Sequence, residues 1–260
     1  MSNNGTKAAA GGLRLLVLGG TSAIAEATAR LYAAEGARIV LAGRDKERLE
    51  AVQRDLRLRG ATAVMVEAGD LAEGAGPTRL DAMAHHFGGF DHVLLAYGVL
   101  GEQWLAQTNA AETARILQVN LVSAAQWANA VAALFEAQGS GVLVVLGSVA
   151  GDRGKRSNYV YGAAKAGLEV LLQGIAHRFA GQRSASGRLR VALVKPGPTD
   201  TPMTAGMKKG GPLWSTPEAV ARVVRRAADR GGVTYAPARW RLLMLVLRLL
   251  PRPIWNRLDI

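Results

Sequence analysis

The chain has 260 residues, 49% of them hydrophobic, which is enough to bury a large core. It contains no cysteine, so disulfides, thiolate metal sites and cysteine nucleophiles are excluded, and we expect no bound metal. The formal net charge of +12 favours anionic partners such as phosphates or acidic lipid surfaces, although an arginine-rich soluble enzyme would show the same excess.

Residues 1–12 are small and mostly polar, and this pattern predicts a flexible N-terminal lead. The segment lacks the apolar stretch of a secretory signal. No window of the chain reaches the roughly 18 to 20 apolar residues that a membrane span needs. We therefore expect a cytoplasmic protein.

Short apolar runs that predict buried strands alternate with helical patterns along the chain. The predicted strands cover 13–18, 38–42, 61–67, 92–96, 141–146, 188–194 and 233–236. The predicted helices cover 22–35, 45–59, 77–87, 110–138, 158–180 and 217–230. This alternation predicts an α/β fold: one Rossmann-type domain over 13–237, with a doubly wound parallel sheet and helices on both faces.

A glycine-containing turn joins the first predicted strand to its helix. Such a turn exposes backbone N–H groups, and the helix N-terminus attracts a pyrophosphate. Because only positions 19 and 20 of this turn are glycine, a plain strand–helix connection is the alternative. The residues expected to contact the cofactor here are Gly19, Thr21, Ser22, Ala23 and Ile24.

Arg44 follows the second predicted strand, where the adenosine ribose of a dinucleotide would lie. An acidic residue there would bind a free 2′-hydroxyl, whereas arginine suits a 2′-phosphate. The position therefore predicts that NADP(H) is favoured over NAD(H). A solvated arginine at the start of a helix is the alternative interpretation.

The next two strand ends carry further candidate contacts. Asp70 and Leu71 follow the third strand, where a carboxylate can accept a hydrogen bond from the adenine amino group, or simply cap a turn. Ala96, Tyr97 and Gly98 follow the fourth strand, and the glycine would let the backbone approach the cofactor. In an open parallel sheet this edge is where ligands bind.

A candidate acid/base pair begins the helix over 158–180. Tyr161 and Lys165 are four residues apart, so they share a helix face, and the ammonium is expected to lower the pKa of the phenol. Ser148 ends the fifth strand and could donate to a substrate carbonyl. Asn120 lies in mid-helix, where it would hold a kink and a water next to Lys165. Tyr159 is a weaker candidate, since nothing basic lies four residues after it.

These positions resemble the short-chain dehydrogenase/reductase family from residue 13 to residue 236. The resemblance implies hydride transfer between nicotinamide C4 and a carbonyl carbon, with Asn120, Ser148, Tyr161 and Lys165 as the catalytic residues. Tyr161 would supply or remove the proton and Lys165 would hold the nicotinamide ribose. Members usually form dimers or tetramers, so the resemblance also implies a homo-dimer or homo-tetramer.

The segment after the sixth strand resembles the family's Pro-Gly loop, which contacts the nicotinamide. Pro196 and Gly197 would form this contact, Thr199 would bind the carboxamide and Thr201 would lie near the pyrophosphate.

The glycine turn departs from the family pattern. Ala23 and Ala25 stand at usual glycine positions, and Tyr97 stands where Asn or Ala is usual. The two alanines bear on how closely the pyrophosphate can approach, not on the chemistry.

Two segments bear on the substrate. Residues 201–215 should form a flexible substrate loop, in which Lys208 and Lys209 would suit an anionic group or simply be exposed. Residues 238–260 are rich in leucine and are flanked by arginine and tryptophan. They predict either a basic amphipathic tail on the acidic inner face of the cell membrane or a helix buried between subunits.

Within the family, this tail and the Gly-Gly-Thr-Ser turn resemble the reductases of polyprenyl-phosphate-linked, decaprenyl-type 2-keto-pentoses. That resemblance implies a lipid-linked ketone substrate and a partner flavin oxidase. The rival predictions are a reductase of another apolar ketone, such as a keto-steroid, retinoid or keto-sphingoid base, and a non-catalytic dinucleotide-binding scaffold. The basic residues are scattered rather than interleaved with aromatics, so we expect no nucleic-acid partner.

Overall fold

A computed structural model describes residues 12–74, 77–181 and 189–258 of the chain. Its strands are β1 (Arg14–Leu18), β2 (Arg38–Gly43), β3 (Ala63–Ala68), β4 (His92–Leu95), β5 (Gly141–Leu146), β6 (Leu189–Pro196) and β7 (Gly232–Ala236). Its longer helices are α1 (Ala23–Ala34), α2 (Lys46–Leu58), α3 (Pro77–Phe87), α5 (Ala110–Leu117), α6 (Ser123–Gln138), α7 (Tyr159–Gly181), α8 (Pro217–Arg230) and α9 (Arg239–Leu249). The predicted lead over 1–12 lies outside the described residues except for Gly12.

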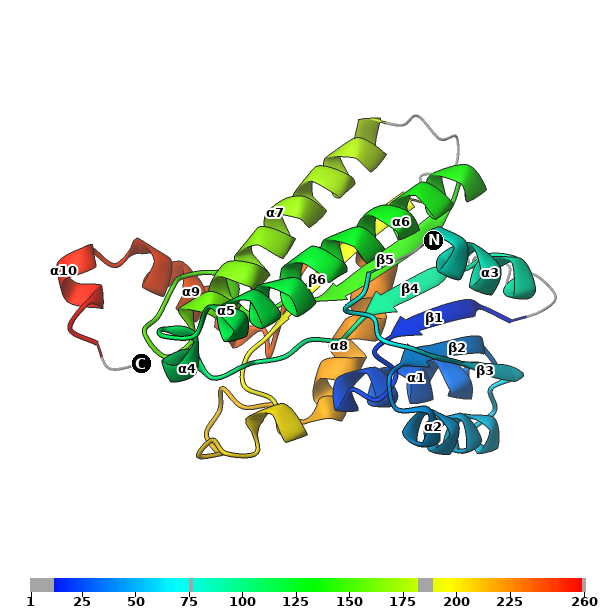
Figure 1. Cartoon of the computed structure of the whole chain (residues 1–260), viewed down its shortest axis with the longest axis horizontal. Coiled ribbons are helices and arrows are strands. Elements are labelled where there is room, and N and C mark those ends of the chain that lie inside the picture. The colour runs from blue at the N-terminus through cyan, green and yellow to red at the C-terminus, as the bar shows by residue number, and fades with distance from the viewer. Residues whose placement is uncertain (1–11, 75–76, 182–188, 259–260) are drawn as a thin grey trace, which may run out of the picture.

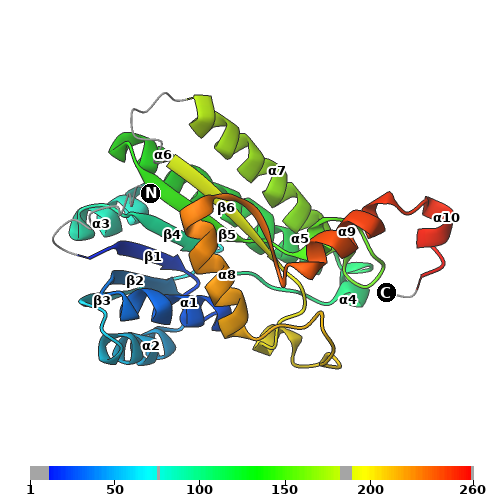
Figure 2. The same cartoon turned by 180° about the vertical axis from the view of Figure 1, so that it is seen from behind.

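The strands form one parallel sheet in the order β3-β2-β1-β4-β5-β6-β7. The order reverses at β1, from which one half of the sheet runs outward to β3 and the other to β7. Figure 1 shows α6 and α7 across one face of the sheet, and Figure 2 shows α1 and α8 across the other. The predicted doubly wound α/β fold is therefore confirmed.

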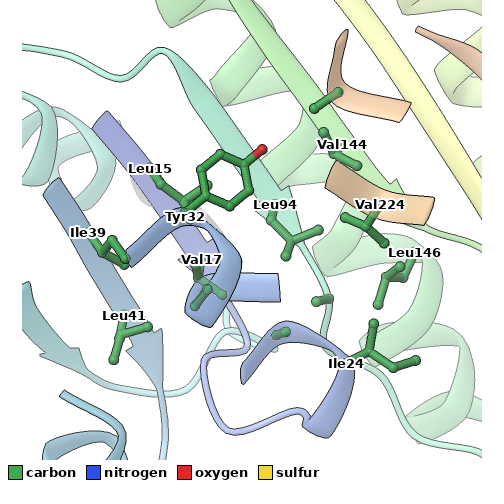
Figure 3. Packing of buried hydrophobic residues seen from close by; sticks show 14 of the residues in the cluster. Leu15, Val17, Ile24, Tyr32, Ile39, Leu41, Leu94, Val144, Leu146 and Val224 are labelled. Atoms are coloured by element: carbon green, nitrogen blue, oxygen red, sulfur yellow. The ribbon is translucent and has the colours of Figure 1, made fainter. Parts of the chain in front are cut away.

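Two buried clusters hold the layers together, one on each face of the sheet. In the first, Val17, Leu94 and Val144 of the sheet face Ile24 of α1 and Val224 of α8 (Figure 3). The second packs α3, α6 and α7 against the other face. Strands buried on both faces explain why their sequences are continuous apolar runs rather than alternating ones.

The predicted helix over 110–138 is interrupted at its middle. Five residues, Gln118–Val122, form a single π-helical segment between α5 and α6. Two further helices of four residues, α4 (Gln103–Ala106) and α10 (Arg252–Trp255), were not predicted. No helix in the described part of the chain has the length and hydrophobicity needed to cross a bilayer.

The elements after β7 extend from one end of the molecule. Because all strands are parallel, β7 ends at the same edge of the sheet as the other strands, and α9 begins there. In both views α9 and α10 project beyond the sheet at the end that also holds α4 (Figures 1 and 2). The tail therefore starts beside the sheet edge where the sequence places its candidate ligand contacts.

Candidate functional site

A cavity of about 680 Å³ runs along the carboxyl edge of the sheet. It is lined by almost every residue that the sequence analysis proposed for a site. From the glycine turn, the strand ends and the loop after β6 these are Gly19, Thr21, Ser22, Ala23, Ile24, Arg44, Asp70, Leu71, Ala96, Tyr97, Gly98, Pro196, Gly197, Thr199 and Thr201. The predicted catalytic residues that line it are Ser148, Tyr161 and Lys165. Asn120 is not among the lining residues and lies buried behind them.

The glycine turn leaves the backbone close to the end of β4. Gly19 has a φ of +97°, and a Cβ added to it would lie 2.8 Å from the backbone nitrogen of Tyr97. Ser22 caps α1 without a side-chain hydrogen bond, so its side chain occupies none of the free N–H groups at that helix end. The first N–H groups of α1 are thus open to an anion, whereas the N–H groups of Gly19, Gly20 and Ser22 donate to backbone carbonyls. Ala25 packs in the core without entering the cavity.

Two arginines reach the cavity next to this turn. Arg44 and Arg48 are both exposed lining residues, with Arg44 just before α2 and Arg48 in its first turn. The side chain of neither forms an ion pair with another residue of the described chain. The sequence analysis missed Arg48, although its spacing from Arg44 was a usable signal. Together the two guanidiniums form a cationic patch at this end of the cavity.

Residues at the ends of β3 and β4 line the cavity and also form hydrogen bonds within the protein. Asp70 accepts a hydrogen bond from the backbone nitrogen of Ala72 at 2.9 Å, so its carboxylate caps the turn while also lining the cavity. Tyr97 shares a 2.9 Å hydrogen bond with Ser123, and burial raises the pKa of its phenol. Tyr97 is therefore fixed as a neutral wall residue beside the turn.

The predicted acid/base pair lies at the other end of the cavity. Tyr161 is 9% exposed and Lys165 is 5% exposed, with the ammonium nitrogen 5.8 Å from the centre of the phenol ring. Lys165 also donates a 3.1 Å hydrogen bond to the carbonyl oxygen of Leu146. Burial lowers the pKa of Lys165 to about 8.

Tyr161 differs from expectation in its proton affinity. The sequence predicted a lowered pKa, whereas burial raises the pKa of Tyr161 to about 12 and a hydrogen bond with Ser148 acts in the opposite direction. The physical reason is that the phenolate would lose more solvation in this enclosed site than its neighbours restore. At neutral pH the residue is therefore a phenol, which is the form that donates a proton.

Asn120 lies within the π-helical segment and is fully buried. Its side-chain nitrogen donates to the carbonyl oxygens of Val99 and Ile116, both at 2.8 Å, and its side-chain oxygen accepts from the nitrogen of Val99 at 3.1 Å. The side chain thus ties the loop after β4 to the interrupted helix. The sequence predicted a kink here, and the structure has a π-helical segment at this position. The predicted water stays a prediction.

The loop after β6 is fastened at both of its ends. Thr199 pairs with Ser215 in a parallel bridge, so the predicted substrate loop closes on itself at its base. Trp240 of α9 donates from its indole nitrogen to the carbonyl oxygen of Leu213 at 3.0 Å. A Cβ added to Gly197 would lie 1.9 Å from that indole nitrogen. The tail therefore touches both the predicted nicotinamide contact and the substrate loop.

The substrate end of the cavity differs from the sequence-based hypothesis. Its lining includes Met203, Met207, Lys155 and Asn158, but neither Lys208 nor Lys209. Lys209 instead pairs with Asp200 at 2.6 Å. Lys155 and Asn158 carried no motif, because the connection between Ser148 and Tyr161 is an irregular loop whose course the sequence does not define.

A buried charge cluster supports the floor of this end. Lys195 of β6 contacts Asp152, which follows the short 3₁₀ helix at Val149–Gly151, and donates to Glu169 of α7 at 2.7 Å. Tyr235 of β7 donates to Asp152 at 2.9 Å. The side chains of Lys195 and Asp152 are each 1% exposed. The cluster joins the elements that carry Ser148 and Lys165 to the two last strands.

The tail presents an apolar stripe to solvent. Leu242, Leu245, Val246 and Leu249 are each at least half exposed and follow the three- and four-residue spacing of one helix face. Met244, on the opposite side, is 5% exposed and anchors α9. The same tail carries five exposed arginines: Arg239, Arg241, Arg248, Arg252 and Arg257.

Comparison with known proteins places the chain among oxidoreductases. Residues 14–210 match the family model for short chain dehydrogenases. An uncharacterized oxidoreductase of Mycobacterium tuberculosis is 38% identical over 253 residues, covering 96% of this chain and 98% of that protein. Cis-4-hydroxycyclohexanecarboxylate dehydrogenase of Sinomonas cyclohexanicum is 34% identical over 194 residues, covering 74% of this chain and 75% of that enzyme.

Solved structures agree with this placement. A levodione reductase superposes with a TM-score of 0.75 at 26% identity, covering 85% of this chain and 94% of that one. A short-chain dehydrogenase from Sphingobium yanoikuyae, solved in complex with NADPH, gives the same TM-score and identity, covering 95% of this chain and 96% of that one.

Proposed function

The chain belongs to the short-chain dehydrogenase family as a dehydrogenase/reductase acting on CH–OH or C=O groups, and we propose that it reduces a ketone with NADPH as the hydride donor. The observation that carries the proposal is the enclosed pair of Tyr161 and Lys165 beside Ser148, at the end of a cavity that begins at a phosphate-type glycine turn.

In this proposal Tyr161, Ser148 and Lys165 have distinct tasks. When bound, the nicotinamide supplies a hydride to the carbonyl carbon. Tyr161, a phenol at neutral pH, gives its proton to the carbonyl oxygen, and Ser148 donates a hydrogen bond that orients the same oxygen. Lys165 in its ammonium form stabilises the phenolate that develops and would hold the nicotinamide ribose. The high pKa of Tyr161 suits the direction of reduction, because a proton must be given rather than taken.

The choice of NADP(H) over NAD(H) is supported by the two arginines at the start of α2. Arg44 and Arg48 line the cavity and have no acidic partner in the described chain, so a 2′-phosphate would supply the missing charge. The Sphingobium relative was solved with NADPH, which supports the same choice.

We also propose that the ketone is apolar or lipid-linked, with a polyprenyl-phosphate 2-keto-pentose as the specific candidate. Support comes from the exposed apolar stripe of α9, which begins beside the substrate loop and is flanked in the sequence by exposed arginines. An acidic membrane surface would cover this stripe and place the enzyme peripherally on the inner face of the membrane. A partner flavin oxidase and a homo-oligomeric state belong to the same proposal.

The test of the catalytic proposal is a single substitution. Tyr161→Phe removes the proton donor and keeps the ring, so turnover of NADPH with any ketone substrate should fall by about 10² to 10⁴-fold while NADPH binding is retained. The readouts are NADPH oxidation over a panel of ketones and cofactor affinity by calorimetry. Tyr159→Phe is the matched control, since Tyr159 is 44% exposed and does not line the cavity. Full turnover in the Tyr161→Phe variant would refute the assignment.

A further inference from the structure

The substrate end of the cavity holds a cation that no acidic residue of the described chain neutralises. Lys155 lies in the loop between the short helix after Ser148 and the start of α7, and it lines the cavity. Its side chain is half-buried and forms neither an ion pair nor a hydrogen bond with the described residues. Burial lowers the pKa of Lys155, and no neighbouring charge acts on it.

An unsatisfied acceptor lies in the same turn. The side-chain oxygen of Asn158 is buried without a hydrogen-bond partner among the described residues, although it lines the cavity. Its backbone nitrogen donates to the carbonyl oxygen of Lys155 at 3.2 Å, so the two residues form one turn. Buried polar atoms nearly always have a partner, and each exception calls for an explanation such as a ligand.

The turn is held in place from outside. Gln103 of α4 accepts a hydrogen bond from the backbone nitrogen of Val160 at 3.0 Å, which fixes the start of α7. Tyr161 follows directly and lines the same end of the cavity. Lys155 and Asn158 therefore face the space next to the proton donor and are carried by an anchored backbone.

The other cations near the cavity either have a partner within the protein or lie at its other end. Lys165 donates to the carbonyl oxygen of Leu146, and Arg115 pairs with Glu112 at 2.7 Å. Arg44 and Arg48 lie at the opposite, adenosine end. Among the described residues, Lys155 is thus the cation at the catalytic end that lacks both an acidic partner and a hydrogen bond.

We propose that Lys155 and Asn158 form a subsite for the substrate, which carries an anionic group, a carboxylate or a phosphate, together with a neighbouring hydrogen-bond donor such as a hydroxyl. The proposal rests on the proposed ketone reduction and names the class of ketone. The ammonium of Lys155 pairs with the anion, and the side-chain oxygen of Asn158 accepts from the donor. Both contacts orient the substrate so that its carbonyl faces Tyr161.

The experiment compares each of two anionic ketones with an uncharged counterpart. 4-Oxocyclohexanecarboxylate is assayed against its methyl ester, and dihydroxyacetone phosphate against dihydroxyacetone, each with NADPH. We expect the native enzyme to prefer the charged member of at least one pair, and that pair identifies carboxylate or phosphate as the anion. Lys155→Met should lower that preference by about 10 to 100-fold, the usual range for losing a charge-assisted hydrogen bond, and Lys155→Arg should keep most of it.

Matched measurements separate the possible failures. Lys208→Met removes an exposed lysine that does not line the cavity and should leave the preference unchanged. Calorimetric binding of cyclohexanecarboxylate, cyclohexanecarboxamide and inorganic phosphate to the enzyme with NADP⁺ reads the subsite without turnover. Anion binding that disappears in Lys155→Met supports the subsite even if none of these ketones is reduced.

Three results would overturn the subsite. The first is equal kcat/KM for charged and neutral ketones in the native enzyme. The second is an equal loss for both members of a pair in Lys155→Met, which would make the residue structural. The third is weakened NADPH binding in that variant, which would assign Lys155 to the cofactor. The proposed ketone reduction is tested separately, because its failure would be seen as unchanged NADPH oxidation in the Tyr161→Phe variant.

Discussion

The buried ammonium of Lys165 lowers the stability of the folded protein at the place where the proposed chemistry needs a cation. A buried ammonium with one neutral hydrogen-bond acceptor has lost most of its hydration, and the result is a pKa lowered from 10.5 to about 8. That fall corresponds to about 3 kcal/mol by which burial disfavours the charged form in the folded protein. A residue kept at such a cost is typical of a functional site.

Replacing this lysine should therefore stabilise the fold while inactivating the enzyme. Below pH 8 Lys165 is charged in both the folded and the unfolded states, so its burial penalty is present in full. Between pH 8 and 10.5 the folded protein releases the proton first, and the penalty fades. We expect Lys165→Met to raise the Tm most below pH 8 and progressively less above it, as measured by calorimetric scans at several pH values. A lower Tm for this variant at neutral pH would contradict the interpretation.

Arg44 and Arg48 lead to a second residue-level prediction. Arg44→Asp should raise the KM for NADPH by about 10 to 100-fold and change that for NADH far less, because the variant would remove the proposed charge-assisted contact to the 2′-phosphate. Arg48→Asp should shift the preference in the same direction. Lys46→Met is the control, since Lys46 lies between the two arginines in the sequence but does not line the cavity. Steady-state kinetics with both cofactors measure the effect, and an unchanged ratio of the two KM values would exclude these contacts.

At the scale of the elements, the sequence predicted most of the fold. The bounds of α3, α8 and β5 coincide with the predicted ranges, because proline starts both helices and β5 is a continuous apolar run. The sequence predicted a kink at Asn120 but not a π-helical segment. Two of the three side-chain hydrogen bonds of Asn120 run to Val99, in the loop after β4. Long-range contacts of this kind leave no local pattern.

Some residues of the candidate site could be predicted from the sequence and others could not. Residues that end strands or start helices were predictable, because a parallel sheet brings these ends to one edge. Lys155 and Trp240 were not, since one lies in an irregular loop and the other reaches the site from a tail that packs back against β7.

The contact between Gly197 and Trp240 yields a prediction about two elements. Gly197→Ala would drive a methyl group into the indole ring, which must move and release the carbonyl of Leu213. We expect a loss of about 1 to 3 kcal/mol in stability, as for overpacking elsewhere, and a raised KM for the ketone. Chemical denaturation and steady-state kinetics measure the two effects.

The double variant Gly197→Ala, Trp240→Ala checks the cause. Because the smaller side chain leaves room for the methyl group, the double variant should lose less stability than the sum of the losses in Gly197→Ala and Trp240→Ala. If the two losses simply add, the indole ring is not the obstacle.

At the scale of the whole molecule, the exposed stripe of α9 distinguishes a membrane surface from a second subunit. Changing Leu242 and Leu249 to Glu should keep the protein in the supernatant when vesicles with acidic lipid are sedimented, while the native chain pellets with them. Leu58→Glu is the control, because Leu58 is 90% exposed but lies on α2.

Light scattering on the same proteins measures their molecular mass and so tests whether the stripe is a subunit interface. If the double Glu variant sediments with vesicles like the native chain but becomes monomeric, the stripe is a subunit interface. If its mass is unchanged and it no longer pellets, the stripe binds lipid.

Trp240 places the tail and the substrate loop in one thermodynamic cycle. The indole contacts Gly197, and its nitrogen donates to the carbonyl oxygen of Leu213. If a ligand that orders the loop acts on α9 through this contact, lipid binding at α9 acts on the ligand in turn. Such effects are reciprocal by necessity. If lipid at the tail tightens NADPH binding by some factor, then NADPH must tighten lipid binding by the same factor. Cofactor saturation would then regulate how much of the enzyme resides at the bilayer, and the reduced cofactor pool would act as a recruitment signal.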